Sequence, residues 1–167
     1  MKNIFNKNIN YKNKAGFSVV EVLIACMIMS MIILALMSAA TRGIGLSINA
    51  LKKVQASNLI EEGIEVIKAT RDNNWTTIAN LNTETKQYLS FDSNSNTWSL
   101  GETPVALIDG FEREVIFYPV YRDSNDDIAS VGTLDSGIKK VTVKVSWAGS
   151  NMTNSKEITF YLANIFN

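Results

Sequence analysis

The longest hydrophobic stretch in the chain is also its simplest. Residues 17–40 form an apolar run of 24 residues that contains one charged side chain, Glu21, and no proline or glycine. As a helix the run measures about 36 Å at 1.5 Å per residue, against a hydrocarbon core of roughly 30 Å. The pattern therefore predicts a helix long enough to span a bilayer.

Helical periodicity continues beyond this run. Residues 46–71 contain no proline and carry an apolar stripe. The stripe consists of Val54, Ile60, Ile64 and Ile67, with Leu59, Gly63 and Val66 beside it. A basic residue followed by asparagines, Arg71 to Asn74, then favours a helix end. We expect one helix from residue 17 to about residue 72, with either a kink or a plain join at Gly43 and Gly45.

After residue 75 the hydrophobic period changes from helical to two. Apolar Val141, Val143, Val145 and Trp147 alternate with polar residues, and segment 156–162 repeats the pattern. These segments predict a hairpin with a polar connection over residues 148–155. Residues 112–121 predict a third strand that is apolar on both faces, in which Pro119 indicates that the strand end lies at a sheet edge. Residues 87–91 and 97–100 flank an Asn- and Ser-rich turn and predict another hairpin.

These elements predict an α+β fold, in which a long N-terminal helix packs on a C-terminal antiparallel sheet. The apolar stripe of the helix needs a buried partner, and one face of the sheet supplies it. We expect a membrane-spanning part at residues 17–40, a soluble half of the helix at 41–75 and a sheet domain at 76–167.

The charge distribution orients the chain and narrows its function. The chain has 16 basic and 16 acidic residues, but the first 16 positions hold four lysines and no acid. This asymmetry predicts an N-terminus in the cytoplasm and a domain that faces outward. Without those lysines 12 basic residues face 16 acidic ones, which argues against nucleic-acid binding. The chain has no histidine, the commonest general base and metal ligand, so we expect no enzyme.

Glu21 is the residue that composition explains least. A carboxylate in a membrane helix costs about 2.5 to 3.5 kcal/mol on insertion scales and requires a partner. If the chain is cut after Gly16, Phe17 gains an amino group one helical turn from Glu21. Pairing of this amine with Glu21 of another chain would set the axial register of neighbouring helices.

Residues 16–25, GFSVVEVLIA, resemble the type IV prepilin signature in Gly16, Phe17 and Glu21. The resemblance implies that residues 1–16 are a leader, that a prepilin peptidase cuts between Gly16 and Phe17 and methylates the Phe17 amine, and that Glu21 acts in filament assembly. It also implies a pilin-like fold, and partners that are like subunits, the peptidase, an inner-membrane assembly platform and, before assembly, membrane lipid. The protein would lie in the bacterial inner membrane and then in an extracellular or periplasmic filament. Ser18 stands where threonine is more usual. The lone Cys26 excludes an intrachain disulfide, which favours a minor pilin or pseudopilin over many major pilins.

Two alternatives apply to the N-terminus. One is an ordinary secretory signal ending at the small residues 38–40, although the apolar core of such signals has about 7 to 15 residues. The other is a plain single-pass anchor for an extracellular binding domain that joins no filament.

Two acidic segments raise further candidates. Asp123, Asn125 and Asp127 are spaced like the start of a calcium loop, and the resemblance adds that some pseudopilins bind calcium. Ile128 and Leu134 stand where that loop needs glycine and glutamate, so we favour a solvated turn. Glu112 and Glu114 flank Arg113 on an alternating strand, which predicts an exposed, ion-paired face.

Overall fold

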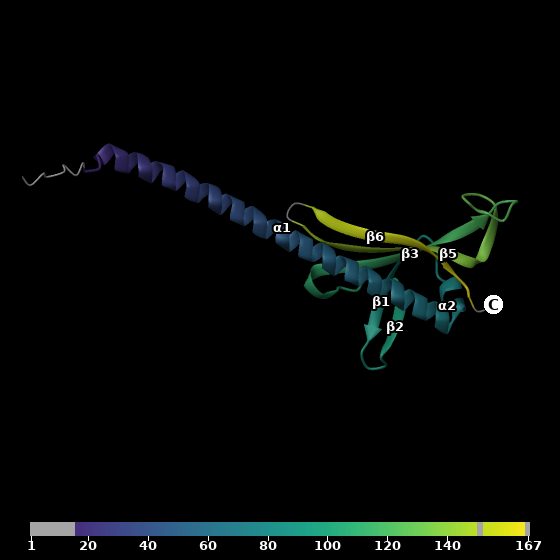
Figure 1. Ribbon diagram of the computed structural model, residues 1–167. Coiled ribbons are helices and arrows are strands. Elements are labelled where there is room, and N and C mark those ends of the chain that lie inside the picture. The colour runs from purple at the N-terminus through teal and green to yellow at the C-terminus, as the bar shows by residue number, and fades with distance from the viewer. Residues whose placement is uncertain (1–15, 150–151, 166–167) are drawn as a thin grey trace, which may run out of the picture. The chain divides into compact units, whose positions relative to one another are not determined.

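The computed structural model describes residues 16–149 and 152–165, so the lysine-rich segment 1–15 of the predicted leader lies outside the described residues. The fold is α+β, as predicted (Figure 1). It has two compact units, one ending at Ser47 and one beginning at Ile48. The elements are α1 (Val19–Asn73), α2 (Trp75–Ala79), β1 (Lys86–Asp92), β2 (Thr97–Gly101), a 3₁₀ turn (Ile108–Gly110), β3 (Phe111–Arg122), β4 (Ile128–Ala129), β5 (Thr133–Ala148) and β6 (Thr153–Ala163).

Helix α1 begins and ends within two residues of the prediction, at Val19 and Asn73. Gly43 and Gly45 both lie in helical backbone, and neither has an atom of another residue near the position of a Cβ. After α1, Asn74 caps α2 by accepting a hydrogen bond from the Thr76 N–H at 2.9 Å. The asparagines thus end one helix and start the next, as their side-chain chemistry favours.

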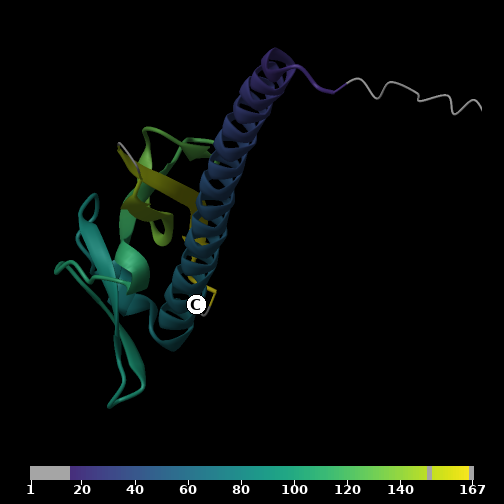
Figure 2. The same ribbon diagram turned by 90° about the vertical axis from the view of Figure 1, so that its left-hand side faces the viewer.

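The strands form one antiparallel sheet in the order β2-β1-β3-β5-β6, with β4 pairing the end of β3. Within the second unit they lie to one side of residues 48–73 of α1 (Figure 2). The predicted hairpins β1–β2 and β5–β6 are both present. The connection in the second is shorter than predicted, because pairing continues to Ala148 and Thr153, beyond the apolar residues that marked the strands.

The core of the second unit lies between α1 and one face of the sheet. The helix buries Ala56, Ile60, Gly63, Val66 and Ile67, spaced at three and four residues as one helical face requires. The sheet contributes Leu89, Val115, Phe117, Val141, Val143, Val145, Trp147 and Leu162. Val54 was wrongly placed in this stripe and is 56% exposed, because the buried face of α1 begins at Ala56.

A register shift interrupts the pairing of β3 with β5 between Pro119 and Val120. Pro119 pairs with Lys139, whereas Val120 pairs with Asp135, so β5 carries extra residues at this point. Pro119 therefore lies inside β3 at a bulge and does not mark the strand end as predicted. A bulge tolerates proline because the ladder is already interrupted there.

Candidate assembly motif at the N-terminus

Phe17 and Glu21 lie on either side of the N-terminal end of α1, Phe17 just before the helix and Glu21 in its first turn. The Ser18 carbonyl accepts the first hydrogen bonds, from the N–H groups of Glu21 at 3.0 Å and Val22 at 3.2 Å. Glu21 therefore lies in the first turn, where a negative charge interacts favourably with the helix dipole. Phe17 precedes the helix and is 82% exposed. A Cβ at Gly16 would meet no atom within 4 Å, so packing does not require glycine there.

The Glu21 carboxylate is exposed and has no ion pair or hydrogen bond with any residue in 16–149 or 152–165. The nearest basic residue along α1 is Arg42, about 31 Å away at 1.5 Å per residue. The described part of the chain thus contains no cation that offsets the cost of this carboxylate in an apolar helix.

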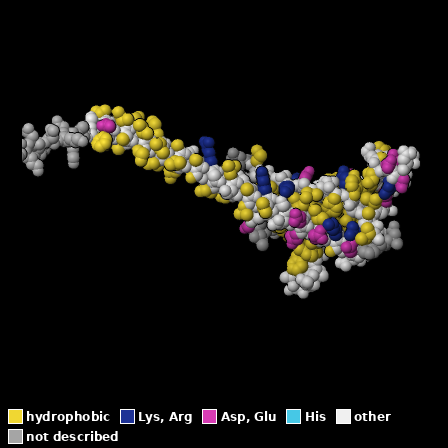
Figure 3. Space-filling view, viewed as in Figure 1, with side chains coloured by type: hydrophobic (Ala, Val, Ile, Leu, Met, Phe, Trp, Pro, Cys, Tyr) yellow, Lys and Arg dark blue, Asp and Glu magenta, His cyan; other side chains and the backbone are white. Residues whose placement is uncertain are grey.

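Around Glu21, the surface of α1 is mostly apolar. Every side chain from Gly16 to Leu51 is exposed, and hydrophobic side chains cover the visible face of the N-terminal half of α1 (Figure 3). Among the described residues, α1 is the single helix that is long and apolar enough to cross a membrane. Ser30, a polar residue within this apolar half, is satisfied locally, since its hydroxyl donates to the Cys26 carbonyl at 2.7 Å.

In the second unit, Arg113 holds α1 to the sheet, a role that differs from the one predicted from the sequence. We predicted an exposed charged face here, but Arg113 is 2% exposed. Its Nη1 donates to the Leu59 carbonyl at 2.9 Å and to Glu62 Oε2 at 2.8 Å. The guanidinium carbon lies 5.4 Å from the ring centroid of Trp98, a cation–π contact worth about 2 kcal/mol when desolvated.

The alternation of residues along β3 could have predicted that Arg113 is buried. Arg113 is in phase with Phe111, Val115 and Phe117, which all face α1. Alternation alone thus places the guanidinium on the apolar side, and Gly63 of α1 leaves room for it. A Cβ on Gly63 would lie 3.1 Å from Arg113 Cδ and 3.3 Å from Val143 Cγ1.

On the opposite face of the sheet, Glu114 is ion-paired as predicted but is 6% exposed. It contacts Lys86 Nζ at 2.6 Å and Lys144 Nζ at 3.3 Å. Burial by itself would raise the pKa of Glu114, but hydrogen bonds and charge from both lysines outweigh it and hold the pKa below its ordinary value. The same contact with Glu114 raises the pKa of Lys86.

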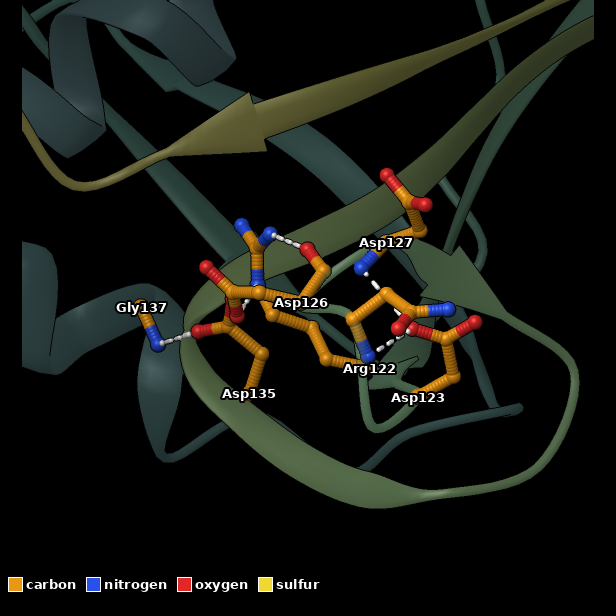
Figure 4. A network of polar contacts seen from close by, with 7 residues as sticks. Arg122, Asp123, Asp126, Asp127, Asp135 and Gly137 are labelled. Atoms are coloured by element: carbon orange, nitrogen blue, oxygen red, sulfur yellow. Dashed lines mark hydrogen bonds and ion pairs between the residues drawn. The ribbon is translucent and has the colours of Figure 1, made fainter.

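The segment with calcium-loop spacing is a tight turn organised by its own side chains (Figure 4). The Asp123 carboxylate accepts the N–H groups of Asn125 at 2.8 Å and Asp127 at 3.0 Å. Arg122 Nε donates to Asp135 Oδ2 at 2.6 Å and Nη1 donates to the Asp126 carbonyl at 2.6 Å. The hydrogen bond from Arg122, followed by the Gly137 N–H, lowers the pKa of Asp135.

The structure thus supplies a positive charge, that of Arg122, to a turn rich in carboxylates. No group of three or more Asp, Glu, His or Cys side chains that could hold a metal ion occurs among the residues described.

Comparison with known proteins identifies the N-terminal segment. A family model described as the prokaryotic N-terminal methylation motif matches residues 11–37, which include Gly16, Phe17 and Glu21. No curated protein and no solved structure matches the chain. The chain therefore carries a type IV pilin-like prepilin signature. Its long helix on a six-stranded antiparallel sheet is consistent with a pilin-like fold, and the motif indicates a structural protein.

Proposed function

We propose that the chain is a minor pilin or pseudopilin, a structural subunit of a type IV pilus-like or type II secretion-like filament. A prepilin peptidase would cut it between Gly16 and Phe17 and methylate the new amine. The subunit would wait in the inner membrane with its N-terminus in the cytoplasm, and an assembly platform would then add it to an extracellular or periplasmic filament.

The observation that carries this proposal is the unpaired Glu21 carboxylate, four residues after Phe17 in the apolar first half of α1, where every side chain is exposed. The cost of about 2.5 to 3.5 kcal/mol falls when a cation approaches. Cleavage creates such a cation at Phe17 of every subunit. An intermolecular pair would offset that cost and fix how far one helix is displaced along the next.

The first test is mass spectrometry of the mature protein from its native cells. We expect an N-terminal methyl-Phe17. An N-terminus at Met1 would support the plain membrane anchor, and an N-terminus at Thr41 would support ordinary secretion.

The second test separates assembly from insertion. Glu21→Val removes the carboxylate, so we expect normal or improved membrane insertion and strongly reduced recovery in the sheared filament fraction. Ser30→Val is the matched control, because Ser30 is also polar within the apolar helix but bonds to its own backbone. Equal filament recovery for the two variants would remove the assembly role of Glu21.

A further inference from the structure

A pocket of about 420 Å³ lies where β3 and β5 change register. Tyr118, Lys140 and Tyr161 are directly paired across β3, β5 and β6, so their side chains share one face of the sheet. Because Lys140 precedes the buried Val141, this face is the one turned away from α1. The pocket is completed by Glu84, Pro119, Val120, Tyr121 and residues 128–130.

The fold fixes the groups that converge here. Glu84 has a positive φ of 63° and donates its N–H to the Phe117 carbonyl at 2.8 Å, which holds this residue beside β3. The bulge after Pro119 brings Tyr121 to the same pocket as Tyr118. Tyr161, from the edge strand β6, is 53% exposed.

No side chain that lines the pocket forms a hydrogen bond or an ion pair within the described part of the chain. The side chains of Glu84, Tyr121 and Tyr161 make no hydrogen bond or ion pair there. The Lys140 ammonium has one contact, with the Tyr118 ring at 5.2 Å from its centroid. In the neighbouring turn, by contrast, Arg122 donates hydrogen bonds to Asp135 and to the Asp126 carbonyl. The pocket thus offers three phenol rings, a donor (the Lys140 ammonium) and an acceptor (the Glu84 carboxylate), neither of which forms a hydrogen bond in the described part of the chain.

The charges of these groups narrow the class of ligand. A cation would meet Lys140 and an anion would meet Glu84. A proline-rich peptide would stack on the rings and its carbonyls could accept from Lys140, but with few N–H groups it would leave the Glu84 carboxylate without a donor. A neutral polyhydroxylated ring uses all of them, because its C–H faces pack on phenol rings and its hydroxyls both donate and accept hydrogen bonds.

We propose that this pocket binds a neutral saccharide. The site is built from the second unit alone, so the inference does not rest on the proposed function and would hold for a filament subunit or for a plain membrane anchor.

The test is saturation-transfer-difference NMR on the full chain in nanodiscs, because detergents with sugar headgroups would compete for the pocket. The probes are methyl α-glycosides of glucose, galactose, mannose and N-acetylglucosamine, and the corresponding trisaccharides. We expect transfer to the ring C–H protons of at least one probe, and a loss of affinity of about tenfold, equivalent to about 1.4 kcal/mol, on Tyr161→Ala. Tyr161→Phe retains the ring and should lose less.

Phe91→Ala is the matched control, since Phe91 is an exposed aromatic residue that does not line the pocket. Absence of transfer to every probe would overturn the proposal. Transfer that survives both Tyr161→Ala and Tyr121→Ala would overturn it as well. Binding of a proline-rich peptide or of tetramethylammonium without any saccharide would reject the ligand class assigned here.

Discussion

Replacing Gly63 with alanine tests how closely α1 approaches the sheet. In an exposed helix this change would stabilise the protein by up to about 1 kcal/mol, because glycine has the lower helix propensity. At Gly63 the added methyl group would lie 3.1 Å from Arg113 Cδ and 3.3 Å from Val143 Cγ1. Neither neighbour moves freely, since hydrogen bonds to Leu59 and Glu62 hold Arg113 and the core surrounds Val143.

The two effects oppose each other, and their magnitudes decide the sign. Overpacking a buried site costs about 1 to 3 kcal/mol. After subtraction of the helix-propensity gain, we expect Gly63→Ala to lower the free energy of unfolding by about 1 kcal/mol. With an m-value of about 2 kcal/mol/M, this corresponds to a fall of about 0.5 M in the urea midpoint. Gly63→Leu should cost considerably more, because the larger side chain meets both strands.

The assay is urea unfolding of the full chain in detergent micelles, followed by tryptophan fluorescence. All three tryptophans, Trp75, Trp98 and Trp147, lie in the second unit, so the signal reports on that unit. Gly45→Ala is the control from the same helix. Nothing lies near the new methyl group there, so its one effect is the gain in helix propensity, and we expect an unchanged or higher midpoint. If Gly63→Ala has the same midpoint as the natural chain or a higher one, the close approach of helix and sheet is refuted.

Three further predictions use the same assay. The folded-state pKa values of Glu114 and Asp135 are lowered, so the stabilisation from these carboxylates is present above the unfolded pKa of about 4 and is lost as pH falls through the folded pKa. The urea midpoint should therefore fall on acidification, and it should fall less steeply in Glu114→Gln. An identical pH profile in that variant would contradict this prediction. Glu62→Gln should lower the free energy of unfolding by about 1 kcal/mol, a modest loss because the Glu62 carboxylate is partly screened by solvent. In an Arg113→Met background the same change should have almost no effect. Equal losses in the two backgrounds would show that the ion pair has no coupling energy. Millimolar calcium should leave the midpoint unchanged, because the turn at 123–127 is already held by its own hydrogen bonds, and a raised midpoint would indicate a calcium site.

Much of the fold could be predicted because each major element carries one clear period. The apolar run and the stripe around Ile60 define α1, and the alternation from Val141 to Trp147 defines β5. The extra length of β5 and the bulge at Pro119 could not be foreseen, because they depend on pairing with β3 and β6 and not on local pattern.

The candidate functional residues also fall into two groups, those that the sequence predicts and those that only the fold brings together. Gly16, Phe17 and Glu21 are adjacent in sequence, so their signature can be recognised without a structure. The contacts of Arg113 with Leu59 and Glu62 join residues more than fifty positions apart, and only the packed structure brings them together. The pocket lined by Tyr118, Tyr121 and Tyr161 could not be predicted for the same reason, since its walls come from several strands.

The order of the strands also bears on how the second unit folds. Each strand pairs with one that is next to it in the chain or separated from it by one short strand or hairpin. Such pairings between neighbouring segments lower the contact order of the sheet, and a lower contact order favours faster folding. With one cysteine in the chain, the process does not wait for an intrachain oxidation step. If the chain is the filament subunit proposed above, the second unit could then reach its folded state without any covalent step beyond the cleavage and methylation at the N-terminus.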